Sequence, residues 1–378
     1  MKIFVVDQSL FSPLYDAQFC EALAEVGHDV TLIGRPLRPE EEQRARGYRT
    51  LPFFYRLSER ALARIGPRAL ALKGVEHGLD MRRLLRLVEQ QQPDIVHFEW
   101  ILLPFIDRYF FKSLGERVPI ILTVHNATAF HGGGSSRLMR IGPEQVFNHV
   151  AHFIPHTEST ANYLASFDIM PDRWTQIQHP AIDLPDPKIE DQPTDGRTTI
   201  LLFGALKPYK GIDVLIEAAL ELASRRQDFR VVIAGKPFMP FDDLKAKIQA
   251  AGQDGLVTFD LRLLPDRDLA AHIKRADIVV FPYREIDASG ALACACQFGK
   301  PIIASQIGTF DEAPARGHVR PIPPADQAGL VQALEQMLDD PEERGKWAEK
   351  SRTLKSLIPS WQQFAEQCTS IYERHRRK

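Results

Sequence analysis

The sequence predicts an α/β protein built from two doubly wound, Rossmann-like domains. Its 378 residues are too many for one ordinary hydrophobic core. Short apolar runs typical of buried strands alternate with helical periodicity along both halves. Between the halves, residues 180–197 contain four prolines and several acidic residues, which prevents a helix or a central strand there. We therefore expect domains at residues 1–180 and 198–360, joined by a linker at 181–197.

The first half begins with a strand, a helix and a second strand. Lys2 to Asp7 is an apolar run, Tyr15 to Val26 has helical spacing, and Asp29 to Gly34 is apolar again. Further strands are expected at residues 94–100, 119–126 and 153–156. The helical segments are expected at residues 79–91, 103–114 and 159–167.

The second half repeats this alternation from Thr198 onward. Its expected strands lie at residues 198–204, 231–235, 256–259, 278–282 and 301–305. Helical periodicity follows at residues 327–338 and 342–357. A last helix, at residues 361–378, is expected to cross back to the first domain.

Composition excludes several classes of protein. Lys and Arg number 47 against 49 Asp and Glu, and this net charge of -2 gives no general attraction to nucleic acid. The four cysteines have no zinc-type spacing, so we expect no metal site. The N-terminus has no signal-peptide apolar region, and no run of about 18 apolar residues occurs, so we expect a cytoplasmic location. An NAD-dependent oxidoreductase is disfavoured because no G-x-G-x-x-G follows Val5 or Leu202.

A candidate phosphate site begins the helix after the strand at residues 278–282. The helix starts at Ser289-Gly290 and continues with Ala291 and Leu292, so its first turn carries no charged side chain. An anion bound there would meet the free backbone N–H groups of that turn. The alternative interpretation is a tightly packed core helix with small residues facing the sheet.

A second candidate lies after the strand that ends at Gly204. Lys207 and Lys210 occupy the turn between this strand and the next helix. Two cations at such a turn suit a diphosphate. For an isolated pair, solvated loop lysines are the simpler interpretation, and pairing with the Ser289 helix start favours binding.

These segments resemble the family 4 retaining glycosyltransferases of the GT-B type, over nearly the whole chain. The matching pieces occur in order: AEVGHDVTLI, TVHN, FIPHTESTANYL, FGALKPYKGIDVLIEA, VVIAG and ADIVVFPYREIDASGALACACQFGKPIIAS. The resemblance implies two domains facing a central cleft, a nucleotide-sugar donor held mainly by the C-terminal domain, and an acceptor held mainly by the N-terminal domain. It also implies no catalytic metal. The only Asp-x-Asp triplet, Asp266-Arg267-Asp268, follows Pro265 and is better explained as helix N-capping.

The resemblance also assigns site residues. The catalytic candidates are His125, Lys207, Lys210 and Glu285. The donor-binding candidates, for a UDP- or GDP-sugar without any cofactor, are Gly204, Lys207, Lys210, Arg262, Glu285, Asp287, Ser289, Gly290, Ala291 and Leu292. The acceptor-binding candidates, for a saccharide or lipid-linked saccharide, are Tyr15, Asp16, Glu99, Trp100 and His131. His125 has a structural alternative, a histidine hydrogen-bonded to backbone, but its position at a strand end favours function.

The chain departs from the family at several positions. Many members carry two glutamates eight residues apart before the Gly-x-Pro matched by residues 299–301, and those positions hold Ile286 and Cys294. Glu285 and Asp287 flank the first position, whereas nothing acidic lies beside the second. Ala205 replaces the usual arginine of the strand-end turn. We interpret the chain as a divergent subgroup, with a non-catalytic nucleotide- or glycan-binding protein and a sugar-nucleotide epimerase as alternatives.

Two further features have open interpretations. His131 and the three glycines after it form either a loop that closes over acceptor or a plain loop. Arginines recur at i+4 spacing beside apolar residues, at positions Arg56, Arg60, Arg64 and Arg68. The default interpretation of these arginines is a solvated basic face. The functional interpretation is that they bind an anionic membrane surface, which would bring the protein to the inner face of the plasma membrane.

Overall fold

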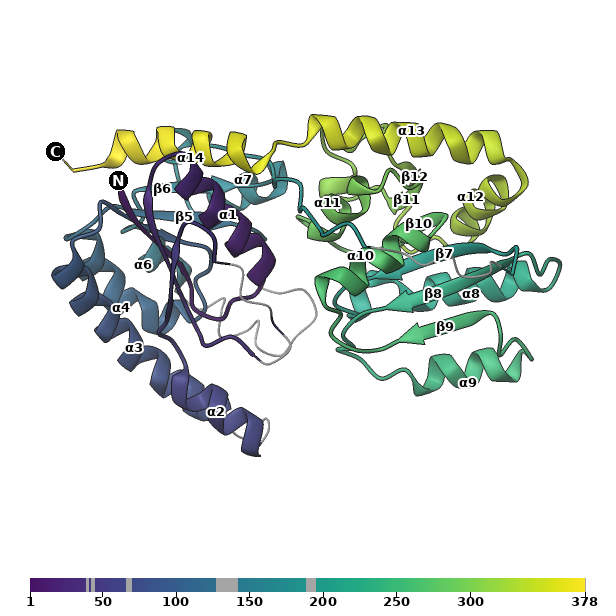
Figure 1. Cartoon of the computed structure of the whole chain (residues 1–378), viewed down its shortest axis with the longest axis horizontal. Helices are drawn as coiled ribbons and strands as arrows, with labels where there is room; N and C mark the ends of the chain where they lie inside the picture. Colours follow the sequence, from purple (N-terminus) through teal and green to yellow (C-terminus); the bar gives the residue numbers. More distant parts are fainter. Residues whose placement is uncertain (39–40, 42–44, 66–69, 127–141, 188–194, 378) are drawn as a thin grey trace. The chain divides into compact units, whose positions relative to one another are not determined.

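The fold was obtained as a computed structural model, which describes residues 1–38, 41, 45–65, 70–126, 142–187 and 195–377. The chain divides into two compact units (Figure 1). Unit 1 comprises Met1–Pro180 together with Pro359–Lys378, and unit 2 comprises Ala181–Ile358. Each unit has one parallel six-stranded sheet, so the predicted fold class is confirmed.

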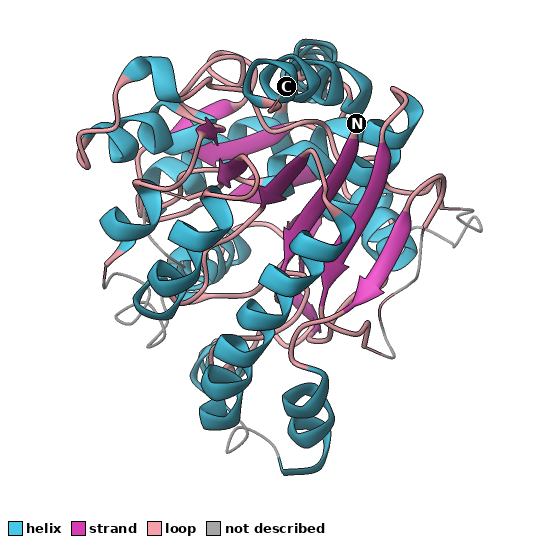
Figure 2. Cartoon of the chain, turned by 90° about the vertical axis from the view of Figure 1, so that its left-hand side faces the viewer, coloured by secondary structure: helices cyan, strands magenta, loops and turns pink. Residues whose placement is uncertain are grey.

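The sheet of unit 1 has the strand order β3-β2-β1-β4-β5-β6. Figure 2 shows the strands in magenta with helices in cyan around them. All its neighbouring strands are parallel, and in the centre Ile3 of β1 lies beside Val30 of β2 and Ile95 of β4. The strands are β1 (Lys2–Asp7), β2 (Asp29–Gly34), β3 (Arg49–Pro52), β4 (Ile95–Phe98), β5 (Ile120–Val124) and β6 (His152–Pro155).

Helices cover both faces of this sheet because successive strand residues point to opposite sides. Ile3 and Val5 pack with α1 and α14, while Phe4 and Val6 pack with α3, α4 and α6. The helices of unit 1 are α1 (Pro13–Glu25), α2 (Arg56–Ile65), α3 (Leu70–Gln91), α4 (Pro104–Gly115), α6 (Pro143–Phe147), α7 (Glu158–Ala165) and α14 (Trp361–His375). The last helix therefore completes the core of unit 1, as expected for a helix that crosses back.

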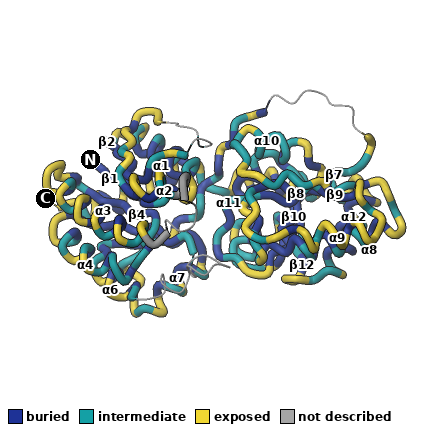
Figure 3. Tube along the Cα trace, turned by 90° about the horizontal axis from the view of Figure 1, so that it is seen from below, coloured by how far each residue is buried: buried dark blue, intermediate teal, exposed yellow. Residues whose placement is uncertain are grey.

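Unit 2 has the strand order β12-β11-β10-β7-β8-β9. Its strands are β7 (Thr198–Phe203), β8 (Phe229–Ala234), β9 (Val257–Asp260), β10 (Ile278–Phe281), β11 (Ile302–Ser305) and β12 (Arg320–Ile322). Its helices are α8 (Ile212–Ala223), α9 (Asp242–Ala250), α10 (Asp266–Arg275), α11 (Gly290–Gln297), α12 (Gln327–Asp339) and α13 (Pro341–Leu357). The core strands of both units are buried along their length, and exposed residues lie on the outer helix faces and loops (Figure 3).

The structure differs from the sequence prediction at the sheet edges and near the linker. The edge strands β3 and β12 were not predicted, because Arg49–Pro52 and Arg320–Ile322 lack an apolar run. Residues 181–187 have no regular structure, yet Leu184 is buried and exchanges two hydrogen bonds of 2.7 Å with the Gln297 side chain. This part of the predicted linker therefore packs onto unit 2.

Both sheets have one point at which the strand order reverses. In unit 1 it lies between β1 and β4, and in unit 2 between β7 and β10. Ligands of open α/β sheets bind outside the carboxyl ends of the strands at such a point. The loops that follow these four strands are therefore where candidate site residues are expected.

Candidate functional site

In unit 2 the loop after β7 brings a buried lysine to the reversal point. Gly204 directly follows β7 with φ 106, a backbone conformation that residues with side chains rarely adopt, and a Cβ there would lie 3.2 Å from the Lys210 amine. Gly211 has the same constraint, since a Cβ there would lie 2.0 Å from the Pro282 carbonyl oxygen. The two glycines let the turn fold tightly enough to bury Lys210 between β7 and β10.

The Lys210 amine is held by two acceptors. It donates to the Tyr283 hydroxyl at 2.5 Å and to the Phe203 carbonyl oxygen at 3.3 Å. Burial, together with the nearby Lys207 cation, lowers the pKa of Lys210 to about 7. A lysine whose neutral and charged forms are both accessible near pH 7 responds strongly to a bound anion.

The candidate helix start lies beside this lysine through Tyr283. The Tyr283 hydroxyl accepts from Lys210, and the nearby Ser289 side chain lowers the Tyr283 pKa against the larger rise that burial causes. Ser289 is the N-cap of α11 and accepts from the Leu292 N–H at 3.4 Å. The two candidate phosphate elements, the Lys210 turn and the Ser289 helix start, are thus linked by one tyrosine, which was not predicted as a site residue.

Other predicted donor residues do not join this group. Arg262 follows the edge strand β9, which β8 separates from β7, and its guanidinium pairs with Asp260 and Asp268 at 2.8 Å each. Glu285 is exposed in the loop before α11, while Asp287 is buried there and its carbonyl accepts from the Thr309 N–H. Lys207 is half-buried, and its amine lies 5.8 Å from the centre of the Phe238 ring.

One predicted role is contradicted by the structure. Asp266 is the first residue of α10 rather than its N-cap, because Pro265 occupies the cap position and no side chain caps the helix. The prediction of N-capping by the Asp-x-Asp triplet was therefore wrong. Cys294, at the position of the missing second glutamate, is buried in α11. Within the described residues, no group of three His, Cys, Asp or Glu side chains is arranged to hold a metal ion.

In unit 1 the reversal point between β1 and β4 carries buried carboxyl groups. Asp7 ends β1, accepts from the N–H groups of Ser9 and Phe11 at 3.0 and 2.8 Å, and is fully buried. Glu99 follows β4 and is also fully buried. Burial raises the pKa of Asp7 to about 6 and that of Glu99 to about 7. Glu99 was predicted to bind acceptor, and the structure also gives one of its oxygens a partner within the protein.

That partner is His125, directly after β5. Its Nε2 lies 2.9 Å from a Glu99 carboxyl oxygen, and its ring stacks on Trp100 with centroids 4.5 Å apart. Burial lowers the pKa of His125 to about 3, so the imidazole is neutral at pH 7. Glu99 and Trp100 together fix the ring's position, and one face of Trp100 is occupied by His125 rather than open to a sugar.

Tyr15 and Asp16, predicted to bind acceptor, are both buried on the first turns of α1. The Tyr15 ring packs edge-on against Trp361 of α14 at 4.9 Å. Burial raises the pKa of Asp16, and the nearby Asp7 carboxyl group raises it in the same direction. Another acceptor candidate, His131, lies outside the described residues, as do the three glycines that follow it.

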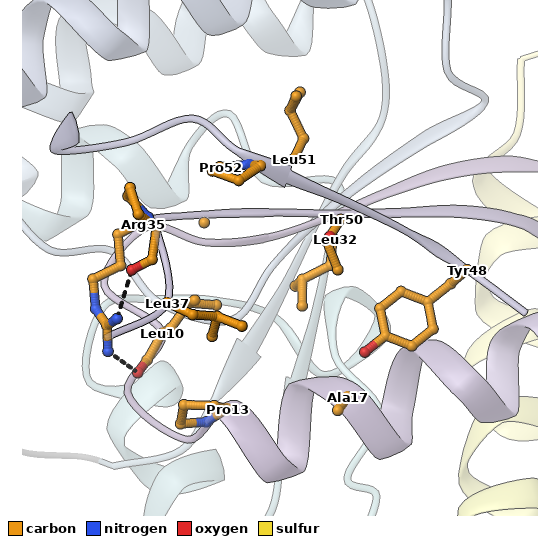
Figure 4. A pocket seen from close by; sticks show the side chains of 12 residues that line it. Leu10, Pro13, Ala17, Leu32, Arg35, Leu37, Tyr48, Thr50, Leu51 and Pro52 are labelled. Atoms are coloured by element: carbon orange, nitrogen blue, oxygen red, sulfur yellow. Dashed lines mark hydrogen bonds between the residues drawn. The ribbon is translucent and has the colours of Figure 1, made fainter. Parts of the chain in front are cut away.

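An apolar pocket opens at the carboxyl ends of β2 and β3 (Figure 4). Its volume is about 220 Å³, and Leu10, Leu32, Leu37 and Tyr48 are among its lining residues. The Arg35 guanidinium at its rim donates to the Leu10 and Pro36 carbonyl oxygens and pairs with Glu41 at 2.5 Å. The pocket therefore presents apolar surface, since its one cation is already paired.

Comparison with known families identifies the two units. Residues 15–179 match the model described as glycosyl transferase 4-like domain, and residues 186–354 match the model described as glycosyl transferases group 1. The chain belongs to the family 4 glycosyltransferases of the GT-B type. The resemblance read from its motifs is confirmed.

Individual relatives of this glycosyltransferase chain are distant. It is 30% identical over 246 residues to a D-inositol 3-phosphate glycosyltransferase of Arthrobacter, covering 61% of this chain and 54% of that protein. It is 23% identical over 373 residues to a phosphatidyl-myo-inositol mannosyltransferase of Mycolicibacterium smegmatis, covering 94% and 88%. The chain thus spans about half the length of the first relative and most of the second.

Two solved structures share the GT-B fold over nearly their full length. Sucrose-phosphate synthase from Thermosynechococcus elongatus superposes with a TM-score of 0.77 at 17% identity, covering 99% of this chain and 98% of that one. Anabaena HepE, crystallised with UDP and glucose, superposes with a TM-score of 0.71 at 14% identity, covering 99% and 100%. At these identities the likeness establishes the fold.

Sequence reasoning missed three polar residues at the reversal points: Asp7, Gln8 and Tyr283. Tyr283 had a usable signal, because it follows the predicted strand at residues 278–282 directly. Asp7 had the same signal at the end of β1. Gln8 had none, since its burial depends on packing from elements distant in the sequence.

Proposed function

We propose that this chain is a retaining glycosyltransferase that moves a hexose from a UDP- or GDP-sugar to a saccharide or lipid-linked saccharide. Unit 2 would hold the donor and unit 1 the acceptor. The observation that carries the proposal is the group formed by Lys210, Tyr283 and Ser289 at the reversal point of unit 2. It combines a cation with a helix N-terminus, the two elements that bind a diphosphate.

The chemistry follows from what must be stabilised. Breaking the bond between the sugar and the diphosphate leaves negative charge on the departing phosphate, which fixed donors and cations stabilise. Lys210 and the first-turn amides of α11 would supply them, so we propose that transfer needs no divalent metal. We also propose that the departing phosphate takes the acceptor proton, because no carboxylate is assigned as a covalent nucleophile.

His125 is proposed to face the donor sugar. Its imidazole is neutral and held by Glu99 and Trp100, so it can hydrogen-bond a sugar hydroxyl without adding charge. Two relatives support the substrate classes by name: one is a mannosyltransferase, and HepE was crystallised with UDP and glucose.

A donor screen tests the proposal. A ligand well above its dissociation constant raises apparent stability, so UDP-, GDP-, ADP- and dTDP-sugars are compared by their effect on Tm. We expect UDP- or GDP-sugars to raise Tm most, and release of the matching nucleotide in the presence of EDTA to show turnover without metal. A non-catalytic binding protein would show the Tm shift without turnover, and an epimerase would convert the donor without acceptor. No shift with any nucleotide would refute donor binding altogether.

We further propose that the hairpin of α2 and α3 docks on an anionic membrane surface. Leu72, Val75 and Leu79 are exposed on one face of α3, at spacings of three and four residues. Glu76 accepts from the Leu57 and Ser58 N–H groups at 2.7 Å, which fixes the start of α2 beside this face, and Leu57 is also exposed. The basic residues Arg56, Arg60, Arg82, Arg83 and Arg86 are exposed on the same two helices.

Exposed apolar side chains flanked by arginines suit a surface that is apolar inside and anionic outside. Of the predicted stripe, the Arg64 side chain and Arg68 lie outside the described part of the chain. Among the described residues, none of the helices is both long and apolar enough to cross a membrane. Docking would therefore occur at the surface, with a cytoplasmic location proposed for the rest of the protein.

A further inference from the structure

Buried polar atoms without partners gather at the reversal point of unit 1. Gln8 follows Asp7 at the end of β1 and is fully buried, and neither its Oε1 nor its Nε2 has a hydrogen-bond partner among the described residues. The same holds for Oδ2 of Asp16, which is 1% exposed. Leaving a buried polar group unpaired is destabilising, and such groups are rare unless a ligand or water pairs them.

These atoms belong to one cluster. The Glu99 N–H donates to the Val6 carbonyl oxygen at 3.0 Å, which places Glu99 beside the end of β1, where Asp7 and Gln8 follow. The charge of Glu99 raises the pKa of both Asp7 and Asp16. The second Glu99 oxygen, Oε1, accepts no hydrogen bond within the described residues and lies 3.6 Å from His97 Nε2. Gln8, Asp7, Asp16 and Glu99, which we name the carboxyl cluster, thus offer acceptor atoms together with one amide donor.

The cluster resists further negative charge. Burial raises the pKa of all three carboxyl groups, so each additional anion there is costly. Among the described residues of unit 1, Arg35 is the only buried arginine or lysine, and its guanidinium pairs with Glu41 and donates to backbone carbonyls. A phosphate group at the cluster would therefore meet carboxyl groups without a free buried cation to balance it.

We propose that the carboxyl cluster binds a neutral, hydroxyl-rich part of the acceptor and excludes a phosphomonoester. This inference rests on the proposed function and specifies its acceptor. Sugar hydroxyls both donate and accept, so they can pair the carboxyl oxygens and both ends of the Gln8 amide. The Arthrobacter relative is named a D-inositol 3-phosphate glycosyltransferase, and the present chain is inferred to select against a phosphate group at this cluster.

Two aromatic side chains mark the side from which a sugar ring would approach. Phe11, three residues after Gln8, is 41% exposed and packs edge-on against Trp100 at 5.2 Å. Sugar rings stack on aromatic faces through their apolar C–H surface. A ring held by this pair would direct its hydroxyl groups toward the buried cluster.

Matched pairs of probes test the charge selection. Mannose and mannose 6-phosphate, glucose and glucose 6-phosphate, and myo-inositol and D-myo-inositol 3-phosphate each differ only by the phosphate group. Binding of each to the full chain is measured by saturation-transfer NMR and titration calorimetry, with and without UDP. We expect at least one neutral member to bind about tenfold or more tightly than its phosphorylated partner, because like charges in a buried site cost several kcal/mol.

Three variants connect the selection to the cluster. Gln8→Met keeps the side-chain volume and removes the amide, so it should weaken binding of the neutral probe about threefold to tenfold. Glu99→Gln removes one carboxylate charge and should therefore strengthen binding of the phosphorylated probe. The ratio of the affinities for the neutral and the phosphorylated probe should fall about tenfold. Glu25→Gln is the matched control, since Glu25 is exposed near the end of α1 and should change neither value. Circular dichroism verifies that each variant is folded.

The outcomes separate this inference from the proposed function. If UDP binds and a phosphorylated probe binds as tightly as its neutral partner, the inference is overturned and the donor site remains. If UDP binds and none of the neutral probes binds, the cluster holds only internal water and the inference is also overturned. If UDP and its sugars fail to bind while the neutral probe is selected, the proposed transfer is wrong and a neutral saccharide site remains.

Discussion

At the scale of single residues, Lys210 has the most direct consequence for donor binding. Its amine is buried against Tyr283 and lies at the reversal point of the sheet. Lys210→Ala should weaken UDP binding about tenfold to a hundredfold and slow turnover by a similar factor, because it removes a charge-assisted hydrogen bond. Titration calorimetry measures the affinity, and Lys245→Ala, an exposed lysine of α9, is the control.

The pH dependence of UDP binding adds a second readout for the same residue. Burial lowers the Lys210 pKa to about 7, so the charged form is lost in the free protein as the pH rises above that value. Since the terminal phosphate has its second pKa near 6, it is fully ionised in this range. UDP affinity should fall between pH 7 and 9 in the wild type and stay flat in Lys210→Arg, whose guanidinium remains charged. A flat wild-type profile would exclude Lys210 from the binding step.

Glu99 should affect stability rather than donor affinity. Its pKa is raised to about 7 in the folded protein, against an ordinary value of 4.5, so the folded state binds more protons than the unfolded state between these values. Stability should therefore fall as the pH rises from about 4.5 to 7, and Asp7, raised to about 6, acts in the same direction. Glu99→Gln should flatten this slope by a few kcal/mol over the window. Urea unfolding at several pH values measures it, and equal slopes in both proteins would contradict the assignment.

At the scale of elements, the start of α11 tests how the diphosphate is bound. A helix N-terminus carries only about half a unit of charge, which fades within a turn, so binding depends on close approach. Gly290→Val should abolish UDP binding by crowding the first turn, whereas Ser289→Ala should cost about 1 kcal/mol of capping and hydrogen bonding. Both are titrated with UDP after circular dichroism has verified folding. If folded Gly290→Val binds UDP with wild-type affinity, the start of α11 does not bind the diphosphate and this helix serves only the core.

The α2 and α3 hairpin gives the second element-scale prediction. The double variant Arg56→Gln/Arg60→Gln and the triple variant Leu72→Ser/Val75→Ser/Leu79→Ser should each reduce sedimentation with vesicles containing phosphatidylglycerol, because both charge and apolar burial contribute. Vesicles of phosphatidylcholine alone should bind the wild type poorly. Arg316→Gln/Arg352→Gln, two exposed arginines of unit 2, is the control for net charge. If both variants sediment with the vesicles as the wild type does, the hairpin does not bind membrane and its exposed face is only solvated.

Elements were more predictable from sequence than their contacts. The bounds of the last three helices were predicted within three residues, because strong periodicity and end signals agree there. Ser360 and Gln363 form a capping box, and Asp340 caps α13. The strands β3 and β12 were missed because short edge strands need no continuous apolar run. Local patterns thus determine element type, while edge positions depend on the neighbouring strand.

The candidate site was predictable only in part, for a related reason. Lys210 and Ser289 each follow a strand, and parallel strands bring such positions to one edge of the sheet. The tyrosine that joins them, and the partner that makes Glu99 a support for His125, depend on side-chain positions that periodicity does not encode. Gln8 became a candidate only because its amide is buried and unpaired among the described residues.

At the scale of the whole molecule, unit 1 is completed by residues from the far end of the chain. Phe364, Cys368 and Ile371 of α14 are fully buried with α1 in the core of unit 1. The Tyr372 hydroxyl lies 2.5 Å from Nδ1 of His97, whose Nε2 bonds the Thr123 hydroxyl at 2.7 Å. The C-terminal helix therefore supports His97, which lies beside Glu99 of the carboxyl cluster, although 275 residues separate Tyr372 from His97.

Ending the chain at Ile358 should unfold unit 1 and leave unit 2 folded. Each large apolar side chain removed from a core costs about 1.5 to 3 kcal/mol, and loss of several from α14 exceeds the stability of an ordinary domain. Limited proteolysis of the truncated chain should degrade Met1–Pro180 and protect Ala181–Ile358, which contains its own sheet and core. Tyr372→Phe, which removes one hydroxyl and keeps the helix, should cost only about 1 kcal/mol and leave unit 1 protected. Equal protease resistance of both units after truncation would show that unit 1 folds without its last helix, and would remove α14 from the support of the carboxyl cluster.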